Sequence, residues 1–332
     1  MNAIVIEELL GKTLDARADL FDAKHEGAFR LFNGFWEGYP SFVADLYGRT
    51  LLLHNYANVS EDAEGFVQAA QDFYLAQLPW LEGVVVKTRR GETPEAKNGR
   101  LVWGEVMIDR VVEFDVRYAI DLTMNRDASF YLDTRNLRRW VLDNVAGKRV
   151  LNTFAYTSSL GVAAQAGGAK RVLHTDLNKK FLNIAKTSYT LNGLPIDKRD
   201  FRTADFFSLM KQLKREGRQF EYVFIDPPFF STTQKGRVDL AQNMTRLINK
   251  IRPLVTNGGH IVAINNALFL SGQDYMNALQ SLCVGDYVEI ESLIPVAEDF
   301  TGYPETRVEN MIKDPTPFNH STKIAILKIN HK

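Results

Sequence analysis

Between Arg149 and Asn265, short apolar segments alternate regularly with segments of helical periodicity. Strands are predicted at 149–154, 171–176, around 201, at 222–226 and at 260–265, with helices at 159–166, 179–191 and 206–215 between them. Strands that alternate with helices form a mainly parallel sheet whose two faces are covered by those helices. The sequence therefore predicts an α/β fold for this half of the chain.

The first half has a different pattern, in which short apolar runs are broken by glycine and proline. It predicts strands at 29–33, 41–45, 50–54 and 84–87, a helix at 61–77, a polar loop at 89–100 and a hairpin at 111–122. Because 332 residues exceed what one hydrophobic core usually serves, two domains are expected. We expect an N-terminal arm at 1–24, a small α+β domain at 25–125 and the α/β domain at 126–332. Two late runs, 287–290 and 322–329, suit an antiparallel pair at the edge of the larger sheet.

Charge and cysteine content narrow the function. The chain has 40 basic and 40 acidic residues, so it lacks the basic excess typical of a constitutive nucleic-acid binder, and any RNA contact needs a local patch. A single cysteine, Cys283, excludes disulfides within the chain and cysteine-built zinc sites. The N-terminus has neither the basic start nor the apolar run of a signal peptide, and no run is long enough to span a membrane. We expect a cytoplasmic protein without a membrane partner or a metal.

Polar residues follow the predicted parallel strands, where ligands bind in open α/β sheets. Asp176 ends the second strand, Asp205 follows the third and Asp226 ends the fourth. A carboxylate in the first two places can bind a ribose and an adenine amino group, although helix capping is the commoner role of an aspartate before a helix. Gly-x-Gly-x-x-Gly, the phosphate-binding P-loop and the hydrolase Gly-x-Ser-x-Gly are all absent, which argues against a dinucleotide dehydrogenase and a hydrolase.

The run Asp226-Pro227-Pro228-Phe229 is the most specific of these signals. Two prolines fix the backbone just after a buried strand, so Asp226 can present its carboxylate to a substrate. Phe229 can stack on a flat substrate such as a base. A purely structural proline loop is the alternative.

At this point the chain resembles the bacterial 23S ribosomal RNA methyltransferases of the class I fold, which include 5-methylcytosine enzymes and a 7-methylguanine enzyme. The resemblance runs from Ala28 to the C-terminus and rests on four motifs. They are the Ala28-Phe-Arg-Leu-Phe-Asn-Gly region, the segment 129–138, the loop Val150-Leu-Asn-Thr-Phe-Ala-Tyr-Thr and Val223-Phe-Ile-Asp-Pro-Pro-Phe-Phe-Ser.

The resemblance implies a Rossmann-like seven-stranded domain that binds S-adenosylmethionine, preceded by an α+β domain on the substrate side. The cofactor-binding residues that it implies are Tyr131, Asp133, Arg135, Asn152, Phe154, Tyr156, Thr157, Asp176, Leu177, Asp205, Phe206 and Asp226.

The chain departs from that family in three places. Few residues precede Ala28, so we expect no N-terminal RNA-binding PUA domain. The loop that starts at Val150 corresponds to the cofactor loop of that family, and Ser158 stands where the family has a glycine in it. The nucleophilic cysteine of the 5-methylcytosine enzymes is replaced by Asn265-Asn266, and Cys283 is expected in a later helix as a small core residue.

The missing cysteine determines the expected chemistry. Carbon-5 of cytosine needs a thiolate to add to the ring before it can attack a methyl group. A nitrogen lone pair needs only alignment with the methyl group. We therefore expect direct in-line N-methylation of a base in ribosomal RNA, with guanine N7 favoured because it carries no proton. Asp226 and Asn265 would orient the base, although the asparagine pair could instead cap a helix.

Three other functions are alternatives to methylation of an RNA base. They are a methyltransferase for a protein or small molecule, a non-catalytic RNA-binding relic of the fold, and a nicotinamide oxidoreductase, which the glycine pattern argues against. A homodimer is left open. Six basic residues can bind phosphate, although solvated loop charge is the usual role of such residues: Arg89, Arg90, Lys97, Arg100, Lys235 and Arg237. His320 can reach the active site or be structural.

Overall fold

The computed structural model describes residues 3–57, 61–228, 230–233, 236–239, 244–308 and 313–331. They form two compact units. The first contains the described residues up to Leu132 and those from Ala297 to Val308, and the second contains Asp133–Val296 and the residues from Lys313 onward.

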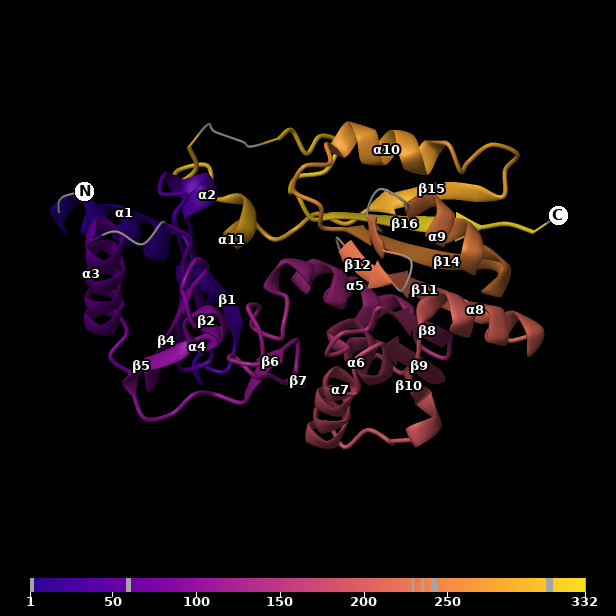
Figure 1. The fold of residues 1–332 in the computed structure, drawn as a ribbon, viewed down its shortest axis with the longest axis horizontal. Helices are drawn as coiled ribbons and strands as arrows, with labels where there is room; N and C mark the ends of the chain where they lie inside the picture. The colour runs from indigo at the N-terminus through magenta and orange to yellow at the C-terminus, as the bar shows by residue number, and fades with distance from the viewer. Residues whose placement is uncertain are drawn as a thin grey trace. The chain divides into compact units, whose positions relative to one another are not determined.

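The second unit is built on a seven-stranded sheet (Figure 1). Five parallel strands come first, and β16 then runs antiparallel to both of its neighbours. In sheet order, the strands are β10 (Phe201–Thr203), β9 (Arg171–Asp176), β8 (Arg149–Thr153), β11 (Phe220–Ile225), β14 (Val255–Asn265), β16 (Lys323–Ile329) and β15 (Val288–Leu293). The order reverses between β8 and β11, so the ligand crevice of an open α/β sheet is expected at their carboxyl ends.

Helices cover both faces of this sheet (Figure 1). On one face, α5 (Arg135–Asn144), α6 (Ser159–Ala166) and α7 (Lys179–Leu191) pack against the strands. On the other, α8 (Phe206–Arg215), α9 (Met244–Ile251) and α10 (Gly272–Gln280) bury a larger apolar cluster. Alternate strand residues supply the two cores, because successive side chains point to opposite faces, and Val223 and Phe224 are an example.

The α/β prediction is confirmed, as are its main strands and helices. The two late runs pair antiparallel at the sheet edge, with Glu289 opposite Lys328. The sequence analysis did not predict α5, α9 or the hairpin of β12 (Phe230–Thr233) and β13 (Gly236–Asp239). Cys283 lies in a turn just beyond α10, so the helical placement predicted for it was wrong.

The first unit contains a five-stranded sheet in the order β1 (Ala28–Asn33), β2 (Phe42–Tyr47), β3 (Thr50–Asn55), β4 (Gly83–Thr88) and β5 (Arg100–Gly104). Its helices are α1 (Ala3–Asp15), α2 (Gly34–Glu37), α3 (Glu61–Gln77), α4 (Pro94–Asn98) and α11 (Glu298–Thr301), and β6 (Arg110–Glu113) pairs with β7 (Val116–Ala119). A short 3₁₀ turn lies at 18–20 in this unit, and two lie at 198–200 and 252–254 in the second unit. A fourth, at 132–134, spans the boundary in the chain between the two units.

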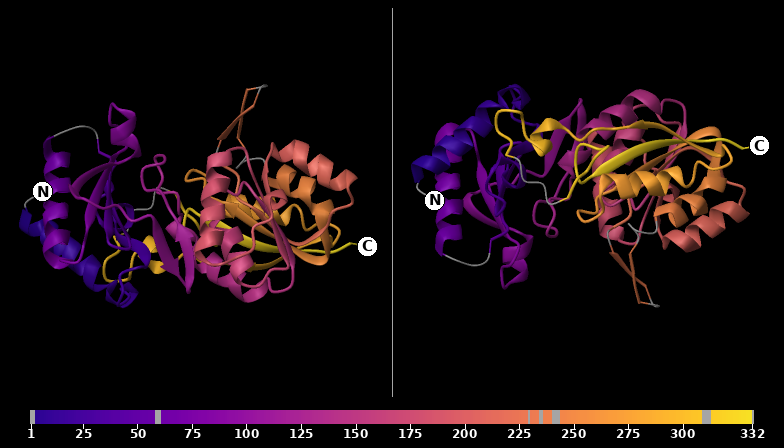
Figure 2. Two further views of the ribbon diagram at one scale, coloured as in Figure 1. Left: turned by 90° about the horizontal axis from the view of Figure 1, so that it is seen from below. Right: turned by 90° about the horizontal axis from the view of Figure 1, so that it is seen from above.

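The 89–100 segment is not wholly a loop, as the sequence had suggested, because it contains α4. Thr93 caps this helix by accepting a hydrogen bond from Ala96 N, and Pro94 occupies its first turn. The expected domain boundary at residue 125 stays a prediction. In the structure, the segment that includes α11 lies against β1, which Figure 2 shows in gold beside the indigo strand.

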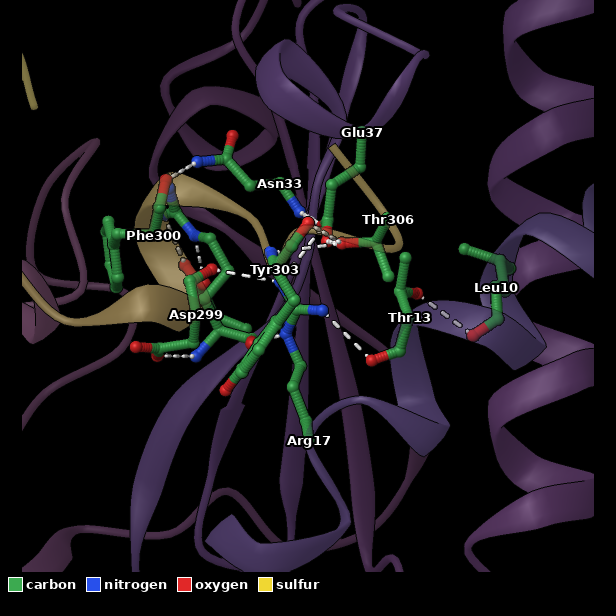
Figure 3. Close-up of polar contacts among 11 residues, drawn as sticks. Leu10, Thr13, Arg17, Asn33, Glu37, Asp299, Phe300, Tyr303 and Thr306 are labelled. Carbon is green, nitrogen blue, oxygen red and sulfur yellow. Dashed lines mark hydrogen bonds and ion pairs between the residues drawn. The ribbon is translucent and has the colours of Figure 1, made fainter. Parts of the chain in front are cut away.

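A buried ion pair joins three separate parts of the first unit (Figure 3). The Arg17 guanidinium is fully buried and lies 3.0 Å from Glu37 Oε2. Three further N–H groups donate to the carbonyl oxygens of Thr13, Arg30 and Asp299. A buried charge is tolerated only when its hydrogen-bonding groups are satisfied in this way.

The carboxylate of Glu37 is held from the other side. Oε2 accepts a hydrogen bond from Asn33 N at 2.7 Å, and Oε1 accepts one from Thr306 Oγ1 at 2.5 Å. Asn33 Nδ2 in turn donates to Phe300 O at 2.6 Å. The segment that begins at Ala297 therefore supplies partners that the early part of the chain needs.

Candidate active site

The parallel register places the predicted site residues at one edge of the sheet. Thr153 of β8 lies opposite Thr175 of β9 and opposite Ile225 of β11, and Ile225 lies opposite Ala263 of β14. The segments that follow these four strands therefore begin side by side. They carry the cofactor loop, Asp176, Asp226 and Asn265.

The cofactor loop has an unusual backbone. Phe154, Tyr156 and Ser158 all have positive φ, at 52°, 51° and 64°. Such angles in residues other than glycine cost of order 1–3 kcal/mol each and cluster at ligand sites. The loop is fixed by two backbone hydrogen bonds, from Ala155 N to Thr175 O and from Ser158 N to Ala155 O. Ser158 thus adopts a left-handed conformation, which glycine would adopt at little steric cost.

Asp176 connects the cofactor loop to the end of β9. Its Oδ2 accepts a hydrogen bond from Tyr156 N at 2.9 Å, and its Oδ1 accepts one from Asn178 N at 2.8 Å. Burial raises the pKa of this carboxyl. Asn178, not Asp176, caps α7, so the capping alternative does not describe Asp176. Each carboxylate oxygen keeps a second lone pair with which to accept a hydroxyl group.

Asp205 is the N-cap residue of α8. It is exposed, and its side chain accepts a hydrogen bond from Ser208 N at 2.9 Å. The capping role is therefore present, and the cofactor role of Asp205 stays a prediction.

Two pairs of aromatic rings form an apolar surface beside these carboxylates. Phe154 stacks on Phe206, with their ring centroids 4.8 Å apart. Tyr156 meets Phe181 edge-on at 4.5 Å. An adenine-sized ring would find both apolar area and neighbouring hydrogen-bond acceptors here.

Asp226 is an acid of the second unit whose pKa is strongly raised. Its Oδ1 atom is buried and has no hydrogen-bond partner among the described residues. Loss of solvation, together with repulsion from Asp133, raises its pKa to about 7. Asp133 Oδ2 accepts a hydrogen bond from Thr322 Oγ1 at 2.6 Å. A cationic ligand beside these two carboxylates would relieve both effects, which fits the positively charged sulfonium and ammonium groups of S-adenosylmethionine.

The prolines that follow Asp226 differ in exposure, since Pro227 is buried and Pro228 is exposed. Phe229 lies outside the described residues, and so does Lys235.

Asn265 is buried, and its Oδ1 accepts a hydrogen bond from Ala267 N at 3.0 Å. Asn266 is exposed. The structure therefore shows Asn265 shaping the turn after β14, and its contact with a substrate stays a prediction.

Lys323 is a buried charged residue at this edge that the sequence reasoning missed. It lies opposite Asn265 across the β14–β16 pair, and its Nζ donates to Ala267 O at 3.1 Å and to Ser321 O. Burial lowers the pKa of its ammonium group to about 8. Its one sequence signal is a lysine at the start of the largely apolar strand β16.

The remaining predicted residues are dispersed. Tyr131 lies in the first unit and donates its hydroxyl to Asp127 Oδ2 at 3.2 Å. Asn152 is buried below α6, where Gly161 packs closely on its amide. Leu177 is 65% exposed beside Asp176.

Three further predicted residues, Arg135, Thr157 and His320, lie in the second unit. Arg135 opens α5, and Thr157 is buried within the cofactor loop. His320 is buried, and its Nδ1 accepts a hydrogen bond from Thr322 N at 3.1 Å, so it supports the residue that contacts Asp133.

Asp226→Asn is expected to stabilise the ligand-free protein at pH 8. The folded state raises the pKa of Asp226 to about 7, so its contribution to stability is fully present below pH ~4 and is lost as the pH rises through 7. Asparagine carries no charge to bury, and the gain should reach a few kcal/mol at pH 8. Urea unfolding of both proteins from pH 4 to 8 measures it. A difference that stays constant across this range would contradict the assignment.

None of the helices formed by the described residues has the length and apolar character of a membrane span. Within the same residues, no cluster of three or more His, Cys, Asp or Glu side chains is arranged to bind a metal ion.

Comparison with known proteins places these observations in a family. A family model described as S-adenosylmethionine-dependent methyltransferase matches residues 84–282. The chain is 27% identical to the ribosomal RNA large subunit methyltransferase I of Aeromonas salmonicida, in an alignment that covers 88% of this chain and 75% of that protein. It is 29% identical to the ribosomal RNA large subunit methyltransferase K of Neisseria meningitidis, over 74% of this chain and 71% of that protein.

The ribosomal RNA large subunit methyltransferase K/L of Shewanella amazonensis is 31% identical to this chain. The alignment covers 74% of this chain and 35% of that protein. Among solved structures, SMU.776 in complex with SAH superimposes with a TM-score of 0.85 at 22% identity, over 99% of this chain and 82% of that one. This likeness confirms the seven-stranded fold with its smaller N-terminal sheet.

Proposed function

The chain belongs to the S-adenosylmethionine-dependent methyltransferase family, and from that premise we propose that it methylates a nitrogen atom of a base in large-subunit ribosomal RNA. The observation that carries the proposal is Asp226, a half-buried residue at the carboxyl end of β11 whose buried Oδ1 atom has no hydrogen-bond partner among the described residues. It is followed by two prolines that fix its backbone. A group so placed is suited to accept a hydrogen bond from a substrate.

The RNA substrate is inferred from the relatives. The three relatives compared by sequence bear the names of ribosomal RNA large subunit methyltransferases, and two of them align over more than two thirds of their own length. Because the overall charge of this chain is neutral, RNA binding requires local features of its surface.

The acceptor atom is inferred from the loop after β14. Asn265 and Asn266 occupy the place where the 5-methylcytosine enzymes that the sequence resembles carry a cysteine. Cys283 lies beyond α10 with its thiol against Leu279 O, and burial raises the pKa of that thiol, which disfavours the reactive thiolate. Direct attack by a nitrogen remains, and guanine N7 is the favoured acceptor because it has no proton to lose.

The chemistry divides between the ligand and the protein. S-adenosylmethionine, when bound, supplies a methyl group that its sulfonium charge makes electrophilic. Asp176 and the cofactor-loop backbone would hold the nucleoside part, and Phe154 with Phe206 would offer an apolar surface to its adenine. Asp226 would orient the acceptor base by a hydrogen bond, so that its lone pair points at the methyl group.

Mass spectrometry of nucleosides from ribosomal RNA, with and without the gene, tests this proposal. Loss of one 7-methylguanosine from the large-subunit RNA is the expected result, restored by the wild-type gene and not by Asp226→Ala. Loss of a different methylated base would change the acceptor atom only. An unchanged RNA profile would exclude the RNA substrate and favour a protein or small-molecule acceptor.

Asp176→Asn is expected to weaken binding of S-adenosylmethionine by roughly 10- to 100-fold. Asparagine keeps one acceptor oxygen but replaces the other by an amide donor, which opposes Tyr156 N, and it removes the negative charge that strengthens hydrogen bonds. Calorimetric titration measures the dissociation constant. Asp197→Asn is the control, because Asp197 is an acid of the same unit paired with Arg199. Equal affinities for the two variants would remove Asp176 from the site.

A further inference from the structure

The loop after β14 exposes two adjacent large apolar side chains. Leu268 is 54% exposed and Phe269 is 67% exposed, and Asn266 beside them is also exposed. Single exposed apolar residues are normal on protein surfaces, whereas neighbouring ones at the mouth of a site often mark an interaction. We call residues 266–270 the β14 loop.

The β14 loop is held in place by hydrogen bonds. Ala267 N donates to Asn265 Oδ1, and Leu270 N donates to Ala267 O. The ammonium groups of Lys323 and Lys313 donate to Ala267 O at 3.1 Å and to Phe269 O at 2.6 Å. The exposure of the apolar pair is therefore a property of a fixed turn. A loop whose backbone is fixed before binding loses little backbone entropy when it makes a contact.

The loop starts at the same edge of the sheet as the proposed catalytic carboxylate. β11 and β14 are parallel neighbours, with Ile225 opposite Ala263, so Asp226 and Asn265 both lie just past this pair (Figure 1). The β14 loop and the Asp-Pro-Pro segment thus begin at neighbouring strand ends. The exposed Lys313 brings positive charge to the loop, which suits a polyanion.

We propose that Leu268 and Phe269 form a stacking platform for the nucleobase that flanks the methylated base in the RNA substrate, an inference that rests on the proposed function. An enzyme that modifies a base within folded RNA must take it out of its stack. Its neighbour then loses a stacking partner, and an exposed aromatic side chain can replace that partner.

The test compares Phe269→Ala with Phe269→Trp and with Val284→Ala. Val284 is an 80% exposed apolar residue of the same unit, so its replacement is a matched control for loss of apolar surface. The substrates are ribosomal RNA isolated from a strain lacking the gene and free guanosine, each assayed with radiolabelled S-adenosylmethionine. Binding of S-adenosylmethionine is measured in parallel to show that each variant is folded.

Phe269→Ala is expected to raise the KM for ribosomal RNA by roughly 10- to 100-fold, with unchanged cofactor affinity and an unchanged rate on free guanosine. Phe269→Trp should restore the KM, and Val284→Ala should leave it unaltered. A wild-type KM for Phe269→Ala would overturn the stacking role while leaving the proposed function intact if Asp226→Ala remains inactive. Failure of the wild-type protein to methylate this RNA would overturn both.

Discussion

Asp226→Ala should lower kcat for RNA methylation by roughly 10³-fold, measured at saturating S-adenosylmethionine. The loss is large because a base that is no longer held by the carboxylate samples orientations in which its lone pair misses the methyl group. Misplacement by about 1 Å costs of order 10²-fold in rate, and loss of a fixed electrostatic contact adds to it. The measurement is single-turnover methyl transfer to ribosomal RNA from a strain lacking the gene.

Asp226→Asn distinguishes two roles for this residue. If Asp226 only orients the base, as N7 methylation requires, an amide of the same shape can still hydrogen-bond to the base and should recover at least 10-fold of the lost rate. If Asp226 removes a proton from an exocyclic amine, asparagine should be as inactive as alanine. Equal loss in both variants would therefore argue against guanine N7. A wild-type rate for alanine would remove Asp226 from the mechanism.

Glu37→Ala should destabilise the first unit by about 3–5 kcal/mol, because it leaves the fully buried Arg17 guanidinium without its counter-charge. Urea unfolding followed by tryptophan fluorescence suits this measurement, since Trp36, Trp80 and Trp103 all lie in that unit.

Glu82→Ala is the control for the loss of an ion pair as such. Glu82 pairs with Arg49 on the surface of the same unit at 3.0 Å, and its loss should cost less than about 1 kcal/mol. Combining Glu37→Leu with Arg17→Met should recover much of the stability, because a buried ion pair replaced by apolar groups leaves no unsatisfied charge. Similar losses for Glu37→Ala and Glu82→Ala would show that the buried network is not critical.

Local sequence patterns were sufficient to predict most of the second unit. Strand and helix periodicity is set by which face of each element is buried, and that information lies within each segment. The helix α5 was missed although Leu137 and Val141 have helical spacing, because this segment was interpreted only as a family motif. The role of Asp205 could not be decided from sequence, since a helix cap and a ligand contact require the same residue at the same place.

Features that depend on distant residues were not predictable. The partners of Lys323 come from the turn after β14 and from its own approach loop, and only the assembled sheet brings them together. Likewise, Arg17 donates to Asp299 O across 282 positions of sequence. The positive φ angles of Phe154 and Tyr156 had no glycine to announce them. In each case the decisive contact is long-range or strained, whereas sequence patterns report local preference.

The late segment that completes the first unit has a consequence for biosynthesis. A ribosome makes Arg17, Asn33 and Glu37 early, yet Asp299, Phe300 and Thr306 must emerge before their hydrogen bonds can form. The N-terminal sheet therefore reaches its final form only when translation is nearly finished, after every strand of the second unit except β16 has been made. Vectorial folding of this chain cannot proceed strictly from its first unit to its second, and a nascent chain released early would leave the Arg17–Glu37 ion pair without its hydrogen bonds to Asp299 and Thr306.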